Sequence, residues 1–88
     1  MKIKEGFVVR QVADSWMAVP VGSMAGEMGG LIALNDTAAD IWQILQEEHS
    51  EEEVAEILQR EYDTDMDVIR AHVHEFVEEL SQKGILDR

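Results

Sequence analysis

The chain changes character at Asn35, and this division constrains its fold more than any other feature. Before Asn35 lie five of the six glycines, the only proline, and several runs of β-branched and aromatic residues. After Asn35, apolar residues recur at spacings of three and four among Glu, Asp and Gln. The first pattern is typical of short strands and the second of amphipathic helices. The sequence therefore predicts an α+β fold in which strands come first and helices follow.

Three runs in the first part have the composition of strands, and they cover residues 7–12, 16–21 and 30–34. Because the connections are short, we expect an antiparallel meander with the first and third runs at its edges. Pro20 cannot donate a ladder hydrogen bond, so we expect it near the end of the second strand or at a bulge. The role of the connector Gly22–Met28 is left open by the sequence.

The two predicted edges differ in charge. Lys2, Lys4 and Arg10 lie in or beside the first strand, where such charges discourage unwanted pairing. No charged residue occurs from Met28 to Leu34. An uncharged edge is either covered by the protein's own helices or open to the strand of a partner.

Three helices are predicted in the second part. Asn35 is a good N-cap for the first, and Ser50 with Glu53 has the spacing of a capping box for the second. Asp63, Thr64 and Asp65 supply the predicted turn and cap before the third helix, and Gly84 is the expected stop after it. The predicted buried stripes are Ala38, Ile41, Trp42 and Leu45; Val54, Ile57, Leu58 and Tyr62; and Ile69, Val73, Phe76, Val77 and Leu80.

Size and charge limit the classes of function. A chain of 88 residues is enough for one domain, which we expect to span residues 1–88. The net charge of −12 disfavours nucleic acid and anionic membranes, and it lies wholly after Asn35, where sixteen of the nineteen acidic residues occur. No stretch is long and apolar enough for a membrane helix, and the N-terminus lacks the apolar segment of a signal peptide, so we expect a soluble cytoplasmic protein.

Candidate catalytic and metal sites fail on spacing. Asp63, Asp65 and Asp67 open like a calcium loop, but the sixth and twelfth positions hold Val68 and His74 in place of Gly and Glu. His72 and His74 are two residues apart on a helix and so face different sides. The chain has no cysteine, no nucleophile elbow and no phosphate-binding glycine pattern. We therefore expect no enzyme, no metal and no cofactor.

Three segments carry the pattern of a known protein family. They are an apolar strand followed by Asn35 and a helix containing Trp42, a Glu-rich second helix that ends near Tyr62, and a closing helix followed by Gly84, Ile85 and Leu86. This combination resembles the PqqD-like proteins, which are the peptide chaperones of pyrroloquinoline quinone biosynthesis, and more broadly the RiPP recognition elements. The likeness spans nearly the whole chain.

The resemblance implies a winged-helix-like domain with a three-stranded antiparallel sheet followed by a three-helix bundle. Such a domain binds the leader segment of a ribosomally synthesised precursor peptide, which adds as a strand to the third strand and lies in a groove against the third helix. The domain then presents the peptide to a modifying enzyme, often a radical S-adenosylmethionine enzyme. The uncharged third strand agrees with this expectation.

The resemblance also implies which residues contact the peptide. Leu31, Ile32, Ala33 and Leu34 supply backbone pairing and alternate side-chain contacts. At about 100° per residue, the third helix has two candidate flanks on opposite sides of its core stripe. One flank holds Arg70, His74 and Ser81, and the other holds Asp65, Val68, His72 and Glu79. We favour the second because Val68 adds an apolar contact.

Two alternatives use the same elements differently. A structural subunit could use the uncharged strand edge to form a homodimer. A winged-helix DNA-binding regulator needs basic residues on its third helix, which offers only Arg70 and Lys83 against several carboxylates. We therefore place the DNA-binding alternative below peptide binding.

Overall fold

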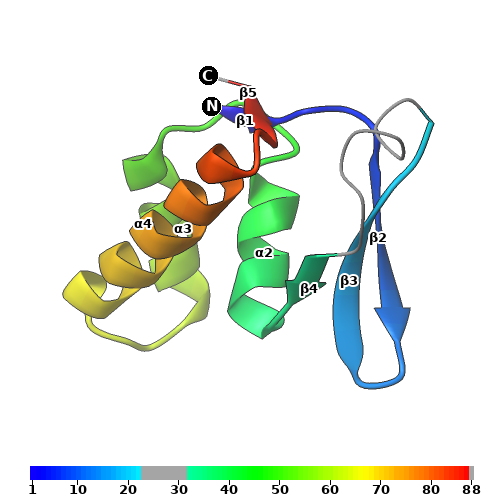
Figure 1. The fold of residues 1–88 in the computed structure, drawn as a ribbon. Helices are drawn as coiled ribbons and strands as arrows, with labels where there is room; N and C mark the ends of the chain where they lie inside the picture. The colour runs from blue at the N-terminus through cyan, green and yellow to red at the C-terminus, as the bar shows by residue number, and fades with distance from the viewer. Residues whose placement is uncertain (23–31, 88) are drawn as a thin grey trace.

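The computed structural model of this chain describes residues 1–22 and 32–87. The α+β class is confirmed, because the strands of the main sheet precede three helices (Figure 1). The described elements are β1 (Lys2–Ile3), β2 (Phe7–Val12), β3 (Ser15–Pro20), β4 (Ile32–Leu34), α2 (Asp36–Ile44), α3 (Glu51–Glu61), α4 (Met66–Gln82) and β5 (Leu86–Asp87).

The main sheet is the predicted antiparallel meander. Its strand order is β2-β3-β4, with Val8 opposite Val19 and Trp16 opposite Leu34. Pro20 is the last residue of β3, as expected for a residue without an amide hydrogen. The third predicted strand began at residue 30, but Leu31 and most of the connector lie outside the described residues.

Local hydrogen bonds fix the N-terminal ends of α2 and α3. The Asn35 side chain accepts from the Ala38 amide at 2.8 Å, which caps α2. At α3, Ser50 Oγ accepts from the Glu53 amide at 3.1 Å, and the Glu53 carboxylate accepts from the Ser50 amide at 2.8 Å. Both predicted caps are therefore confirmed. The hydrogen bond from the Ser50 amide is the main cause that lowers the pKa of the Glu53 carboxylate.

The two ends of α4 differ from each other. Asp65 occupies the N-cap position, as predicted, but the expected side-chain cap is not formed. The Asp65 carbonyl accepts instead from the amides of Val68 and Ile69. At the other end, Gly84 has φ +73°, and hydrogen bonds from Gly84 to Ser81 and from Ile85 to Leu80 form a Schellman motif. The predicted glycine stop is therefore confirmed.

A single core joins the sheet to the helices. The predicted stripes of α2 and α4 are buried in full, and Ala18, Ile32 and Leu34 bury their side chains on the same core. Phe7 from β2 contacts Trp42 of α2 edge to face, with ring centroids 5.4 Å apart. In Figure 1, α2 stands between the main sheet and the pair formed by α3 and α4. One face of the sheet is therefore covered by α2.

The two ends of the chain form a second, two-stranded sheet that the sequence did not predict. β1 and β5 pair antiparallel, with Ile3 opposite Leu86, and they lie side by side at one end of the molecule (Figure 1). The turn at Gly84 carries Ile85 and Leu86 back into the core, where both are buried. A two-residue strand gives no periodic signal, so the pairing itself was missed.

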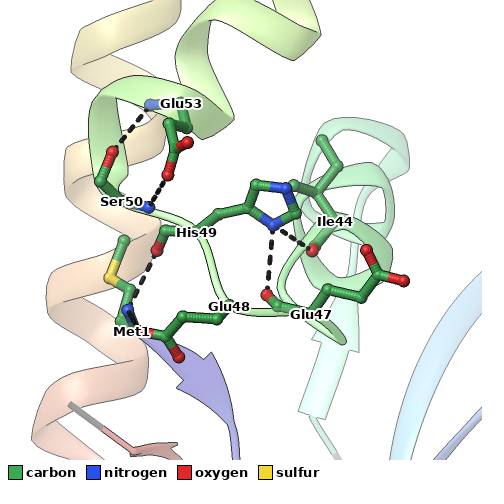
Figure 2. Close-up of polar contacts among 7 residues, drawn as sticks. All are labelled: Met1, Ile44, Glu47, Glu48, His49, Ser50 and Glu53. Carbon is green, nitrogen blue, oxygen red and sulfur yellow. Dashed lines mark hydrogen bonds and ion pairs between the residues drawn. The ribbon is translucent and has the colours of Figure 1, made fainter.

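The loop between α2 and α3 holds the N-terminal residue (Figure 2). The amino group of Met1 donates to Glu48 Oε1 at 2.6 Å and to the His49 carbonyl at 3.0 Å. His49 Nδ1 lies 3.1 Å from the Ile44 carbonyl oxygen and 3.2 Å from that of Glu47. These contacts hold the His49 ring against the backbone of the loop.

No helix in the described residues is long and apolar enough to span a bilayer.

Candidate functional site: an open strand edge beside a groove

The free edge of β4 is the first component of the site. β4 pairs with β3 on one side, and no strand among residues 1–22 and 32–87 pairs with its other side. Ile32 and Leu34 are buried, whereas Ala33 is exposed. Outward-pointing amide and carbonyl groups of an unpaired edge can pair with an added strand. β4 therefore offers a short edge without charge for such pairing.

A groove of about 310 Å³ starts where this edge ends and lies between α2 and α4. Asn35, the residue directly after β4, is one of its lining residues. The groove has a buried apolar floor and an exposed polar rim on α4. The floor includes Ala38, Ile41 and Phe76, and the α4 rim consists of His72, Glu75 and Glu79. An apolar floor with a polar rim can receive side chains of an extended peptide.

A smaller hollow of about 120 Å³ shares Thr37 and His72 with the groove. Its other lining residues include Tyr62 and Val68, and the Val68 side chain is 44% exposed. The Tyr62 hydroxyl donates a hydrogen bond to the Asp40 carboxylate, which ties the end of α3 to α2. That hydrogen bond, together with burial and neighbouring carboxylates, raises the pKa of Tyr62 to about 12. The hydroxyl at this hollow is therefore neutral at physiological pH.

The opposite flank of α4 contacts α3. Arg70 binds the Glu52 carboxylate through Nη2 at 2.8 Å, and His74 Nδ1 lies 3.2 Å from Glu51 Oε2. The Glu52 hydrogen bond raises the pKa of Arg70, and the same contact lowers the pKa of Glu52. These side chains line a separate hollow between α3 and α4. The flank with Arg70 and His74 is therefore turned away from the groove that begins at β4.

Only part of the favoured flank of α4 lines the groove. His72 and Glu79 line the groove, and Val68 lines the adjoining hollow with His72. Asp65 lies at the start of α4 and lines neither space. Among the strand residues, Ile32, Ala33 and Leu34 form β4, and Leu31 falls outside the described residues.

The sequence prediction missed several groove residues. Glu75 lies three residues after His72 and four before Glu79, so helical spacing alone could have included it. Phe76 was predicted only as core, and it also lines the groove. Asn35 and Thr37 reach the groove because the start of α2 faces α4 across it, a tertiary arrangement that spacing does not reveal.

The chemistry of the site is that of binding. Within residues 1–22 and 32–87, no group of three or more His, Asp or Glu residues is placed to hold a metal ion. The buried side-chain nitrogen and oxygen atoms of the same residues all have hydrogen-bond partners. What the site offers is a pairing edge, an apolar floor and a carboxylate rim.

Comparison with solved structures shows the same fold elsewhere. The structure is similar to TbiB1 in complex with the TbiA(beta) leader peptide, with a TM-score of 0.75 and 23% identity over 99% of this chain and 95% of that one. It is also similar to lasso peptide synthetase B1 complexed with the leader peptide, with a TM-score of 0.72 and 27% identity over 96% of this chain and 93% of that one. No curated protein matches the chain significantly.

A family comparison decides the relationship. The family described as coenzyme PQQ synthesis protein D (PqqD) matches residues 20–86, which is most of the chain. The match covers β4 and the helices α2, α3 and α4, and so it includes the edge of β4 and both walls of the groove. The resemblance predicted from the strand, the Asn35 cap and the helix with Trp42 is thereby confirmed. The chain belongs to the PqqD family.

Proposed function

We propose that this protein binds the leader segment of a ribosomally synthesised precursor peptide. The observation that carries the proposal is that one edge of β4, which no strand within residues 1–22 and 32–87 pairs, lies next to a groove between α2 and α4. Strand addition supplies backbone hydrogen bonds for affinity, and the groove supplies side-chain contacts for specificity. Support comes from membership of the PqqD family and from the similar lasso peptide synthetase B1, which is complexed with a leader peptide.

Each predicted site residue has a role in this proposal. Leu31, Ile32, Ala33 and Leu34 pair through their backbone with the leader strand. His72 and Glu79 contact leader side chains in the groove, and Val68 receives an apolar side chain in the adjoining hollow. Asp65 lines neither the groove nor the hollow, and in this proposal it contacts the leader next to the hollow, beside Thr64.

The protein acts in this proposal as a cytoplasmic binding module rather than as an enzyme. It presents the leader-bound precursor to a modifying enzyme, for which a radical S-adenosylmethionine enzyme is the class that we propose. The helices carry most of the acidic residues, and β4 carries none. That distribution leaves the acidic helices free to meet a basic surface on the enzyme.

Fluorescence polarisation tests the proposal. The probe is a labelled synthetic peptide with the leader sequence of the precursor gene adjacent to the gene for this protein. We expect saturable binding of the leader, no binding of a scrambled leader, and no binding of the precursor's core segment. If the leader binds no better than its scrambled form, the proposed function is wrong.

Sedimentation with and without the leader separates peptide binding from the dimer alternative. A complex with one protein and one leader supports strand addition to a free edge. A dimer that does not take up the leader supports a structural subunit whose β4 edge is occupied by a second copy.

A further inference from the structure

We infer that the groove selects leader segments with basic side chains at alternate positions, and that Glu75 is the main residue responsible. This inference rests on the proposed function and specifies the class of leader that the site accepts. Glu75 and Glu79 form the carboxylate rim of the groove on α4, and both are exposed. In the described part of the chain, none of the residues that line the groove is Lys or Arg.

The spacing of the two carboxylates matches an extended peptide. Glu75 and Glu79 are four residues apart on α4, which corresponds to ~6 Å along the helix axis. Side chains on the same face of a strand repeat every two residues, or ~6.8 Å. A leader strand that follows α4 therefore brings two alternate side chains to the two carboxylates. Lys or Arg at those positions forms one ion pair with each.

The positive charges of α4 do not neutralise this rim equally. Arg70 is held on the α3 flank by Glu52 at 2.8 Å and by Asp67 at 3.8 Å. Lys83 lies 3.1 Å from Glu79 and so competes with a leader cation there. Glu75 forms no ion pair with any residue in the described part of the chain. Glu75 is therefore the carboxylate most open to a cation on the peptide.

Charge-neutralising variants test the selection. Glu75→Gln and Glu79→Gln remove the rim charges without shortening the side chains, and Glu78→Gln is the matched control. Glu78 is exposed on the same helix and does not line the groove. Measured with the labelled leader at low salt, Glu75→Gln should weaken binding ~2- to 5-fold, the range for an exposed ion pair. Glu79→Gln should have a smaller effect, and Glu78→Gln should bind as the wild type does.

A charge exchange identifies the partner of Glu75. Glu75→Lys should weaken binding of the natural leader, and replacing one basic leader residue by Glu should restore it. The affinity restored by the charge exchange should fall as the NaCl concentration is raised, because screening weakens exposed ion pairs. Circular dichroism of each variant checks that the fold is retained.

The outcomes separate this inference from the proposed function. If the wild-type protein does not bind the leader, the proposed function is wrong and the selectivity falls with it. If the wild-type protein binds the leader and Glu75→Gln binds it equally well, peptide binding stands and the basic selectivity is overturned. The basic selectivity is also overturned if replacing every Lys and Arg of the leader by Gln leaves the affinity of the leader unchanged.

Discussion

Tyr62 shows how one side chain connects separate elements of the protein. Its hydroxyl donates to the Asp40 carboxylate, so it links the C-terminal end of α3 to α2 beside the smaller hollow. The hydrogen bond, the partial burial of the ring and nearby carboxylates all favour the neutral phenol, which raises its pKa to about 12. An unfolded tyrosine has a pKa of about 10. The link therefore contributes fully to stability below pH ~10 and is lost as pH rises through about 12.

The raised pKa of Tyr62 predicts how its contribution to stability depends on pH. Tyr62→Phe should lower the free energy of unfolding by about 1 kcal/mol at pH 8, the usual net value of one hydrogen bond. The difference between wild type and variant should shrink as pH rises from about 10 towards 12, because the phenol of the unfolded chain ionises from about pH 10 while the native phenol stays protonated until about pH 12. Urea unfolding of both proteins at several pH values measures this difference.

Tyrosine absorbance gives an independent check. Tyr62 is the only tyrosine in the chain, so the absorbance change of phenolate formation reports on this residue alone. The folded protein should titrate with a midpoint near 12. A midpoint near 10 in the folded state would contradict the proposed link to Asp40.

At the level of elements, the C-terminal end of α4 contributes to stability, and one side of the same helix lines the groove. Gly84 stops the helix at φ +73° and sends Ile85 and Leu86 into the core, where β5 pairs with β1. The groove side of the same helix carries His72 and Glu79. Changes at the end of α4 should therefore alter stability, and changes along its groove side should alter binding.

Gly84→Ala tests the structural end. An added Cβ meets no atom within 4 Å, so the cost comes from the left-handed backbone rather than from a clash. We expect a loss of ~1–2 kcal/mol, which corresponds to roughly 4–8 °C in Tm per kcal/mol for a domain of this size. Gln82→Ala, on an exposed residue in the last turn of α4, is the control and should have little effect. Thermal unfolding that leaves Tm unchanged for Gly84→Ala would argue against the role of the Schellman turn.

Two pairs of variants distinguish the flanks of α4. Val68→Ala and His72→Ala alter side chains at the groove and its adjoining hollow, so each should weaken leader binding, by ~2- to 10-fold as expected for partly exposed contacts. Arg70→Gln and His74→Gln alter the flank that contacts α3, so they should change leader affinity less than twofold. Calorimetric titration of all four variants with the leader measures the contrast. The reverse pattern would assign the peptide to the α3 flank.

Comparison of sequence and structure shows which interactions are local. The caps at Asn35 and Ser50, the stop at Gly84 and the buried stripe of α4 were all predicted, because each depends on residues within one or two helical turns. The pairing of β1 with β5 was not predicted, because it joins chain ends through two-residue strands. The same limit applies to the site. Helical spacing separated the two flanks of α4, but the position of α2 across the groove decided which of them lies at β4.

The whole molecule separates its charge from its pairing edge. The net charge of −12 comes from residues after Asn35, and the described part of β4 consists of Ile32, Ala33 and Leu34. High net charge keeps a protein with an open edge from associating with itself. The other edge of the sheet, β2, contains Arg10, whereas Lys2 lies in β1 and Lys4 lies outside both strands. The expected difference in charge between the two edges therefore rests on Arg10.

The groove distinguishes the two edges further. The groove starts at Asn35, directly after β4, and none of its lining residues comes from β2, which is described in full. A leader strand added to β4 can therefore place its side chains against α4, whereas a strand added to β2 gains backbone pairing without that groove. We accordingly predict one peptide-binding edge per molecule, with β2 as the natural internal comparison.

Amide chemical shifts during titration with the leader peptide test this central claim most directly. In isotope-labelled protein, the amides of Ile32, Ala33 and Leu34 and those of α4 from His72 to Glu79 should shift together and saturate at one leader per protein. The outward-facing amides of β4 should also become protected from hydrogen exchange, while those of β2 should not. Shifts confined to β2, or leader binding that leaves β4 and α4 unchanged, would contradict strand addition at β4.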